Sequence, residues 1–384
     1  MTGSNQSWMN ATLPILGCFG GGSLYGWSGL SPTVQIAFNV GSGLASMVFS
    51  FALASFTIGV LLSPMLLGRI PSRYRLSFAT ALAAASLAAS CVAPSFGIFV
   101  VTYGMGFGFS SGAIYSLAIA HASASRRPNL LVPISVAAFG LGGAVFGPMG
   151  IWLAALGWSV WSTLPALCCL SFVATANLLT TQKPNEYSFV ADNKHIFIKP
   201  GRTILKLWMV FATGSCAGLI VLGLASNFLV TNPASQAATI FAAAAGNTAG
   251  RLSASAVASW CGPKPGILGA LSASILSLTA LGFATAPVMI VAWLFLIAFS
   301  YGQVASQTPL LVSRHFSGSA FPSAFGWVFT GWGAAGLLGP WGAGWVLEKT
   351  GDLRFALLGC ILICLLGLWL TIRLPEPKAK IAEG

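Results

Sequence analysis

The stretch GLASMVFSFALASFTIGVLLSPMLL, from Gly43 to Leu67, contains no charged residue and is followed at once by a loop with Arg69 and Arg73. A helix needs about 20 apolar residues to cross the hydrocarbon core of a bilayer. The whole chain repeats this pattern, because its mean hydropathy is +0.85 and only 6% of its residues are charged. A soluble protein of 384 residues needs far more charged surface. The composition therefore predicts a polytopic helical membrane protein.

The pattern predicts an all-α membrane protein with 12 transmembrane helices in two pseudo-symmetric six-helix bundles. The first six spans are Ala11–Leu30, Gly43–Leu67, Leu76–Val92, Phe96–Ala120, Leu130–Leu156 and Ser159–Leu179. The second six are Ile204–Val230, Ala234–Trp260, Gly266–Ala284, Val288–Leu311, Phe321–Val346 and Phe355–Leu374. We therefore divide the chain into an N-terminal bundle (1–179), a polar central loop (180–203), a C-terminal bundle (204–374) and a tail (375–384).

The positive charges predict the orientation of the spans. With the N-terminus inside the cell, only Lys349 and Arg354 of the 18 Lys and Arg residues fall in an external loop. Cytoplasmic loops of membrane proteins carry such an excess of Lys and Arg. We therefore expect a multi-pass protein of a bacterial-type inner (plasma) membrane, with both termini and the central loop in the cytoplasm.

Two Gly-Pro pairs occupy matching places in the two halves. Gly147-Pro148 lies in the fifth span, after Gly140, and Gly339-Pro340 lies in the eleventh, about half the chain length further on. Glycine lets helices approach closely, and proline weakens the helical hydrogen-bond ladder at a bend. We interpret the pairs as helix-packing or gating sites of a duplicated bundle. The alternative is that glycine and proline are simply common in membrane helices.

The sequence contains no catalytic signature. No nucleophile–base pair and no metal-binding cluster appears, and the eight cysteines show neither zinc-site nor disulfide-framework spacing. All six acidic residues fall in expected loops or in the tail, so no span carries a carboxylate for proton relay. We therefore predict a protein that is not an enzyme, needs no cofactor or metal, binds no nucleic acid, and is a monomer whose partners are the lipid bilayer and a small-molecule solute.

Arg251 is the one cation expected inside the membrane. It precedes the end of its span at Trp260 by nine residues, which is roughly 13 Å along a helix. An arginine at this depth is costly unless it faces a wet cavity or a partner, and its planar guanidinium matches a carboxylate with two hydrogen bonds. The alternative is that a helix ends early and Arg251 snorkels to the headgroups. Asn247, one turn earlier, either orients Arg251 or bonds a neighbouring helix.

Several motifs in order resemble the major facilitator superfamily, in its oxalate/formate antiporter and monocarboxylate carrier branch. These are Leu24-Tyr25-Gly26-Trp27-Ser28 before Pro32, Tyr115 before Arg126-Arg127, Ala138-Phe139-Gly140-Leu141-Gly142, Gly246-Asn247-Thr248-Ala249-Gly250-Arg251, and Phe325-Gly326 before Phe329-Thr330-Gly331-Trp332-Gly333. The resemblance covers nearly the whole chain. It implies alternating access between two bundles.

The resemblance also implies roles for particular residues. Arg251 would contact a carboxylate, and Asn247, Tyr25, Trp27, Tyr115, Tyr301 and Trp332 would line the solute site. Interfacial or core packing remains the alternative for the aromatic residues. The loop with Arg69 and Arg73 is the family's gating loop, but Ser72 stands where the family has aspartate. Trp332 stands where the antiporter branch often has lysine, which weakens the case for a dicarboxylate.

The sequence therefore predicts a secondary transporter of a small organic anion, most readily a monocarboxylate, that works as an exchanger (antiporter) or uniporter. Two alternatives stay open. One is efflux of a neutral or amphipathic metabolite, which an interior rich in aromatic residues and free of carboxylates allows. The other is a transporter-like scaffold or sensor, which the missing loop aspartates allow.

Overall fold

The computed structural model describes residues 14–67, 70–123, 128–157, 199–316 and 320–375, which form helices and no strand. The first half contains η1 (Gly22–Gly26), α2 (Trp27–Phe38), α3 (Ser42–Leu66), α4 (Ser72–Cys91), α5 (Phe96–Phe99), the π-helical η3 (Val100–Phe107), α6 (Gly108–Ser123) and α7 (Pro128–Ala155). The second half contains α9 (Arg202–Leu224), η4 (Ala225–Asn227), α10 (Pro233–Cys261), α11 (Pro263–Phe283), α12 (Pro287–His315), α13 (Phe321–Thr350) and α14 (Arg354–Ile372).

Eleven of the twelve expected spans coincide with helical segments of the described chain. The first expected span is a helix over residues 14–21 that continues through η1 into α2, and the fourth runs through α5, η3 and α6. The expected span Ser159–Leu179 lies outside the described residues. Seven of the helical segments are long and apolar enough to cross a membrane by length and composition alone. The hydropathy pattern therefore located these helices, with shifts of a few residues at most ends and a larger one at the end of the first span, which continues past Leu30 to Phe38.

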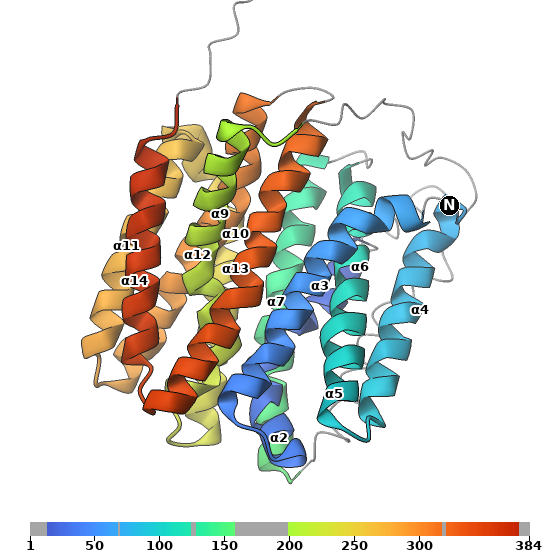
Figure 1. Cartoon of the computed structure of the whole chain (residues 1–384), viewed down its shortest axis with the longest axis vertical. Helices are drawn as coiled ribbons and strands as arrows, with labels where there is room; N and C mark the ends of the chain where they lie inside the picture. The colour runs from blue at the N-terminus through green and yellow to red at the C-terminus, as the bar shows by residue number, and fades with distance from the viewer. Residues whose placement is uncertain (1–13, 68–69, 124–127, 158–198, 317–319, 376–384) are drawn as a thin grey trace, which may run out of the picture.

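The helices of each half lie together, and the two halves stand side by side (Figure 1). Within the first half α3 packs on α6, and within the second half α10 packs on α12. Two helix pairs join the halves, because α3 lies against α13 and α7 lies against α10. We call these pairs the α3–α13 seam and the α7–α10 seam.

Glycine brings the helix backbones into contact inside each half. A Cβ atom added to Gly112 of α6 would overlap the carbonyl oxygen of Phe56 on α3, and one added to Gly246 of α10 would overlap the carbonyl oxygen of Phe295 on α12. Small residues allow such close approach, and van der Waals packing is a main source of helix association in membranes. Each half is therefore tightly packed inside.

The two ends of the bundle differ in charge. The end that we call the basic end carries the first residues of α4, α9 and α11 and the last residues of α12, including Arg75, Arg202, Lys264 and Arg314. At the opposite end, which we call the Glu348 end, α13 continues to Thr350 and stops at Gly351, whose φ of 69° is the left-handed conformation that glycine adopts readily. The expectation that every acidic residue lies in a loop or the tail was therefore wrong for Glu348, which is helical.

Hydrogen bonds join the halves at the Glu348 end. The backbone N–H of Gly43, at the start of α3, donates to Oε2 of Glu348 at 2.7 Å. The Ser42 hydroxyl donates to the Gly344 carbonyl at 3.2 Å, and deeper in the seam the Trp341 N–H donates to Ser50 Oγ at 3.0 Å. Oriented N–H groups at a helix start favour a carboxylate. The α3–α13 seam is therefore closed by polar contacts from its middle to the Glu348 end.

Candidate functional site

Arg251 lies in the middle of α10 and points toward the other half of the molecule. Its Nε donates to Oδ1 of Asn247, one helical turn earlier, at 3.0 Å, and Nη2 donates to the Tyr25 hydroxyl across the interface at 3.4 Å. The helix continues for ten residues beyond Arg251, to Cys261, so the premise that α10 ends early is wrong. Arg251 is half-buried and Asn247 is fully buried. Asn247 therefore fixes the guanidinium toward the centre of the molecule.

The positive charge of Arg251 has no carboxylate partner among the described residues. The acidic side chains in the described part of the chain are Glu348 and Asp352, and both lie at the Glu348 end. Nδ2 of Asn247 is buried and makes no hydrogen bond to any described residue. An unpaired buried N–H costs about 1–3 kcal/mol, and an unpaired buried charge costs more. The site therefore offers donors and a charge to an acceptor that is not part of the described chain.

Three aromatic side chains connect Arg251 to both halves. The Tyr25 and Tyr301 hydroxyls are 3.0 Å apart, and Trp332 Nε1 donates to the Tyr301 hydroxyl at 2.7 Å. The guanidinium carbon of Arg251 lies 5.8 Å from the centre of the Tyr301 ring. Tyr25 comes from η1 in the first half, whereas Tyr301 and Trp332 come from α12 and α13 in the second. The structure therefore brings together five predicted site residues, which we call the Arg251 cluster: Arg251, Asn247, Tyr25, Tyr301 and Trp332.

Apolar rings surround the Arg251 cluster on the side of the first half. Phe56 lies with its ring centre 5.4 Å from that of Trp332, and Phe139 lies 4.9 Å from Tyr25. Tyr115, another predicted site residue, contacts both rings at 5.6 and 5.4 Å and is half-buried. Its hydroxyl is also within electrostatic reach of Arg251. The wall that faces the cation is therefore aromatic, with one hydroxyl at its edge.

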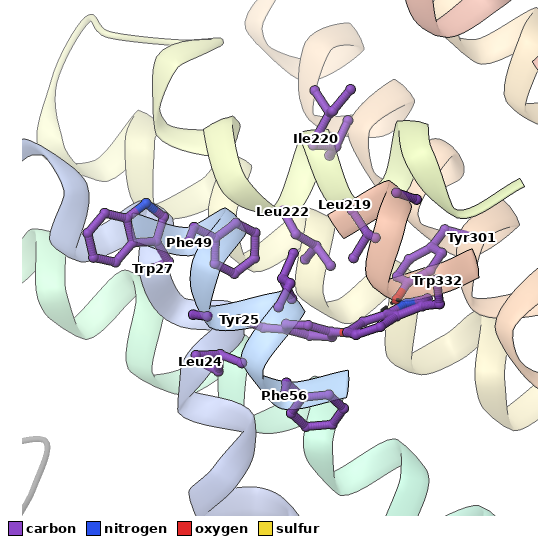
Figure 2. Close-up of a cluster of buried hydrophobic side chains, with 14 of the residues drawn as sticks. Leu24, Tyr25, Trp27, Phe49, Phe56, Leu219, Ile220, Leu222, Tyr301 and Trp332 are labelled. Atoms are coloured by element: carbon purple, nitrogen blue, oxygen red, sulfur yellow. Dashed lines mark hydrogen bonds between the residues drawn. The ribbon is translucent and has the colours of Figure 1, made fainter. Parts of the chain in front are cut away.

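One side of the Arg251 cluster is closed by packed side chains. Figure 2 shows Tyr25 reaching toward Trp332 and Tyr301, with Leu219 and Leu222 on one side and Phe56 on the other. The leucines belong to the part of α9 that approaches the Glu348 end, and both are buried. Apolar side chains therefore separate the Arg251 cluster from the Glu348 end.

Trp27 does not join the Arg251 cluster. Its ring is fully buried and lies 5.3 Å from the ring of Tyr103 in η3, and Figure 2 shows it apart from Tyr25 and Trp332. Trp27 is two residues from Tyr25, and residues two apart do not share one face of a helix. In this conformation Trp27 is a core residue of the first half.

The predicted glycine sites face different neighbours. A Cβ atom on Gly140 would overlap Thr248 Oγ1 and lie 3.2 Å from Oδ1 of Asn247, and one on Gly147 would overlap Ile240. Both glycines therefore contact the other half, across the α7–α10 seam. A Cβ atom on Gly339 would lie 3.2 Å from Sγ of Cys216, within its own half. Pro148 and Pro340 lie inside α7 and α13. Arg69 and the side chain of Arg73 lie outside the described residues.

Sequence reasoning did not select Phe56, Phe139 or Phe329 for the site. Phe329 stacks on Trp332, with ring centres 5.5 Å apart and planes inclined by 15°. Its spacing of three residues from Trp332 could have indicated a shared helix face. Phe56 and Phe139 come from α3 and α7, so only the tertiary arrangement places them here.

Comparison of the chain with known proteins found no matching family model and no matching curated protein. Solved structures do match. The inward-open xylose transporter XylE from E. coli shares 16% identity with a TM-score of 0.79, covering 97% of both chains. A point mutant of the nucleoside transporter NupG shares 15% identity with a TM-score of 0.74, covering 96% of this chain and 100% of its own. These likenesses confirm the predicted all-α membrane fold of the major facilitator type.

Proposed function

We propose that the chain is a secondary transporter that moves a small organic anion, a monocarboxylate, by alternating access, as an exchanger or a uniporter. The observation that carries the proposal is the unpaired Arg251 at the interface of the halves, held by Asn247 and Tyr25. A guanidinium and a carboxylate form two parallel charge-assisted hydrogen bonds. A monocarboxylate would accept hydrogen bonds from the guanidinium and from Nδ2 of Asn247 together, and would neutralise the charge.

The transport cycle follows from the two seams. The halves are hydrogen-bonded at the Glu348 end, and the matching XylE structure is described as inward open. The positive-inside rule makes the basic end cytoplasmic, as in a bacterial-type inner membrane. The solute would then enter from the cytoplasm in the present conformation. Opening would require separation of Glu348 from α3 and closure at the basic end.

A neutral solute is the second candidate. Both solved relatives carry neutral solutes by name, a pentose and nucleosides. The tyrosine hydroxyls and the aromatic wall of the Arg251 cluster could bind such a solute. Arg251 favours the anion, because a neutral solute would leave the charge of this half-buried side chain without a counter-charge. A scaffold or sensor that moves no solute is the third candidate.

Counterflow in proteoliposomes tests the proposal. Radiolabelled small carboxylates should accumulate against excess unlabelled solute, whereas a scaffold gives no counterflow. Arg251→Gln should weaken carboxylate binding by about 2 kcal/mol or more, roughly 30-fold. Arg251→Lys should retain part of the affinity, because lysine keeps the positive charge but cannot form the two parallel hydrogen bonds of a guanidinium. Arg354→Gln, which removes a cation at the Glu348 end, is the control. Unchanged carboxylate affinity in well-expressed Arg251→Gln would exclude the anion site.

A further inference from the structure

A ladder of aromatic rings leads along α13 to the Arg251 cluster. It consists of Phe321, Phe325, Phe329 and Trp332, spaced by four, four and three residues. Successive ring centres lie 5.7, 5.8 and 5.5 Å apart, and the first and last pairs are stacked with planes inclined by 9° and 15°. Residues three and four apart share one face of a helix. We call this face the aromatic ladder.

The aromatic ladder points into the molecule, not toward lipid. The outer face of α13 carries Leu338, Trp341 and Trp345, which are exposed. Trp332, on the ladder, instead contacts Phe56 of the other half. Phe325 and Phe329 nevertheless remain partly exposed, whereas Trp332 is buried. The accessible ring surface on the inward face therefore lies on the basic side of Trp332, where a solute approaches Arg251.

The aromatic ladder presents aromatic rings to a solute but few hydrogen-bond donors or acceptors. Trp332 Nε1 is already bonded to Tyr301, and phenylalanine rings have no polar atoms. A polyhydroxylated solute placed here would give up hydrogen bonds to water without replacement. A second carboxylate would find no second cation, because Arg251 is the one charged residue of the Arg251 cluster. The surface therefore suits an organic part that is apolar and flat.

Together with the proposed anion site, on which the inference rests, these contacts define the solute. We infer that it is an aryl monocarboxylate, with its carboxylate on Arg251 and its ring against the partly exposed Phe329, next to the buried Trp332. Only Tyr301 separates the two subsites, because the Arg251 guanidinium lies over its ring and Trp332 bonds its hydroxyl. A flat ring stacks on aromatic side chains, and a puckered ring of the same size does not.

Four probes in the counterflow assay test the inference: benzoate, cyclohexanecarboxylate, acetate and oxalate. Benzoate should compete best, about tenfold better than cyclohexanecarboxylate, which differs mainly in planarity. Phe329→Leu should bring the ratio of these two affinities close to one and leave acetate unchanged, whereas Phe329→Tyr, which keeps the ring, should preserve the ratio. Phe241→Leu, at an exposed position of α10, is the matched control and should preserve it too.

The outcomes separate this inference from the proposed function. Acetate or oxalate competing better than benzoate, in an Arg251-dependent manner, would overturn the aryl solute and keep the anion site. Benzamide, the neutral analogue, competing as well as benzoate would overturn the anion site itself. If folded Phe329→Leu still preferred benzoate over cyclohexanecarboxylate to the same extent, the aromatic ladder would not take part in binding the solute ring. Counterflow of none of the probes would contradict both proposals.

Discussion

The two seams that join the halves have the same architecture and different chemistry. In each, one helix contributes glycines and the other contributes side chains, with α13 against α3 and α7 against α10. The α3–α13 seam has polar contacts from its middle to the Glu348 end, where Glu348 caps the start of α3. The α7–α10 seam has polar groups at its centre, where Gly140 faces Thr248 and Asn247. One seam therefore closes an end of the molecule, and the other positions Arg251.

The α3–α13 seam loosens toward the basic end. A Cβ atom on Gly344 would overlap Ser46, and one on Gly336 would lie 2.7 Å from Cβ of Leu53. Near the basic end, a Cβ atom on Gly326 would make only an ordinary contact, 3.6 Å from Leu61. Contacts that are tight at one end and ordinary at the other are expected of two halves that rock about the centre.

The largest expected effect comes from adding bulk where the α3–α13 seam is tightest. Gly344→Leu should reduce counterflow by about tenfold or more, because the new side chain would drive α3 and α13 apart. Gly342→Leu is the control, since Gly342 lies two residues away and a Cβ there meets nothing within 4 Å. Equal rates in the two variants, at equal protein yield, would show that closure at this seam does not limit transport.

A smaller and more informative effect separates the two Gly-Pro sites. Gly147 faces Ile240 across the α7–α10 seam, whereas Gly339 faces Cys216 and Ile220 in its own half. Gly147→Leu should therefore slow counterflow by about fivefold with little change in melting temperature, because the flexible Ile240 side chain yields only in part. Gly339→Leu should mainly lower the melting temperature. If both variants had the same counterflow rate and the same melting temperature, contact across the α7–α10 seam would not differ in its effect from packing within one half.

The fold could be predicted from the sequence because hydropathy and loop charge act locally. Each span is apolar over its own length, and helix rise alone placed Arg251 deep in the membrane. The pairing of Asn247 with Arg251 also follows from their spacing of four residues. These features need no knowledge of how the helices are arranged.

The rest of the site depends on tertiary arrangement. Phe56 and Phe139 reach the Arg251 cluster from α3 and α7, and no spacing in the sequence relates them to Arg251. Trp27 lies two residues from Tyr25 and so points to a different helix face, and packing places its ring against Tyr103 of η3. Glu348 was assigned to a loop because the hydropathy signal weakens before the helix ends at Gly351. Such contacts are decided by packing between segments far apart in the chain.

The smallest expected effect concerns the charge of Glu348. Glu348→Gln keeps an acceptor for the Gly43 N–H but removes the charge that assists this bond and favours the start of α3. The loss should be about 1 kcal/mol, which shifts the balance between closed and open forms of the Glu348 end by about fivefold. Asp352→Asn is the matched control, because Asp352 accepts from the N–H of Arg354 in its own half at 2.8 Å.

Labelling measures this shift directly. Ser46 is buried beneath the contact between Glu348 and Gly43, so a Ser46→Cys thiol should react with a membrane-impermeant maleimide only when the Glu348 end opens. Adding Glu348→Gln should raise the labelling rate about fivefold, and adding Asp352→Asn should leave it unchanged. Equal acceleration by both would indicate a general charge effect at this end of the molecule. No acceleration by Glu348→Gln would assign closure to the other contacts of the α3–α13 seam, because those contacts are the same in both variants.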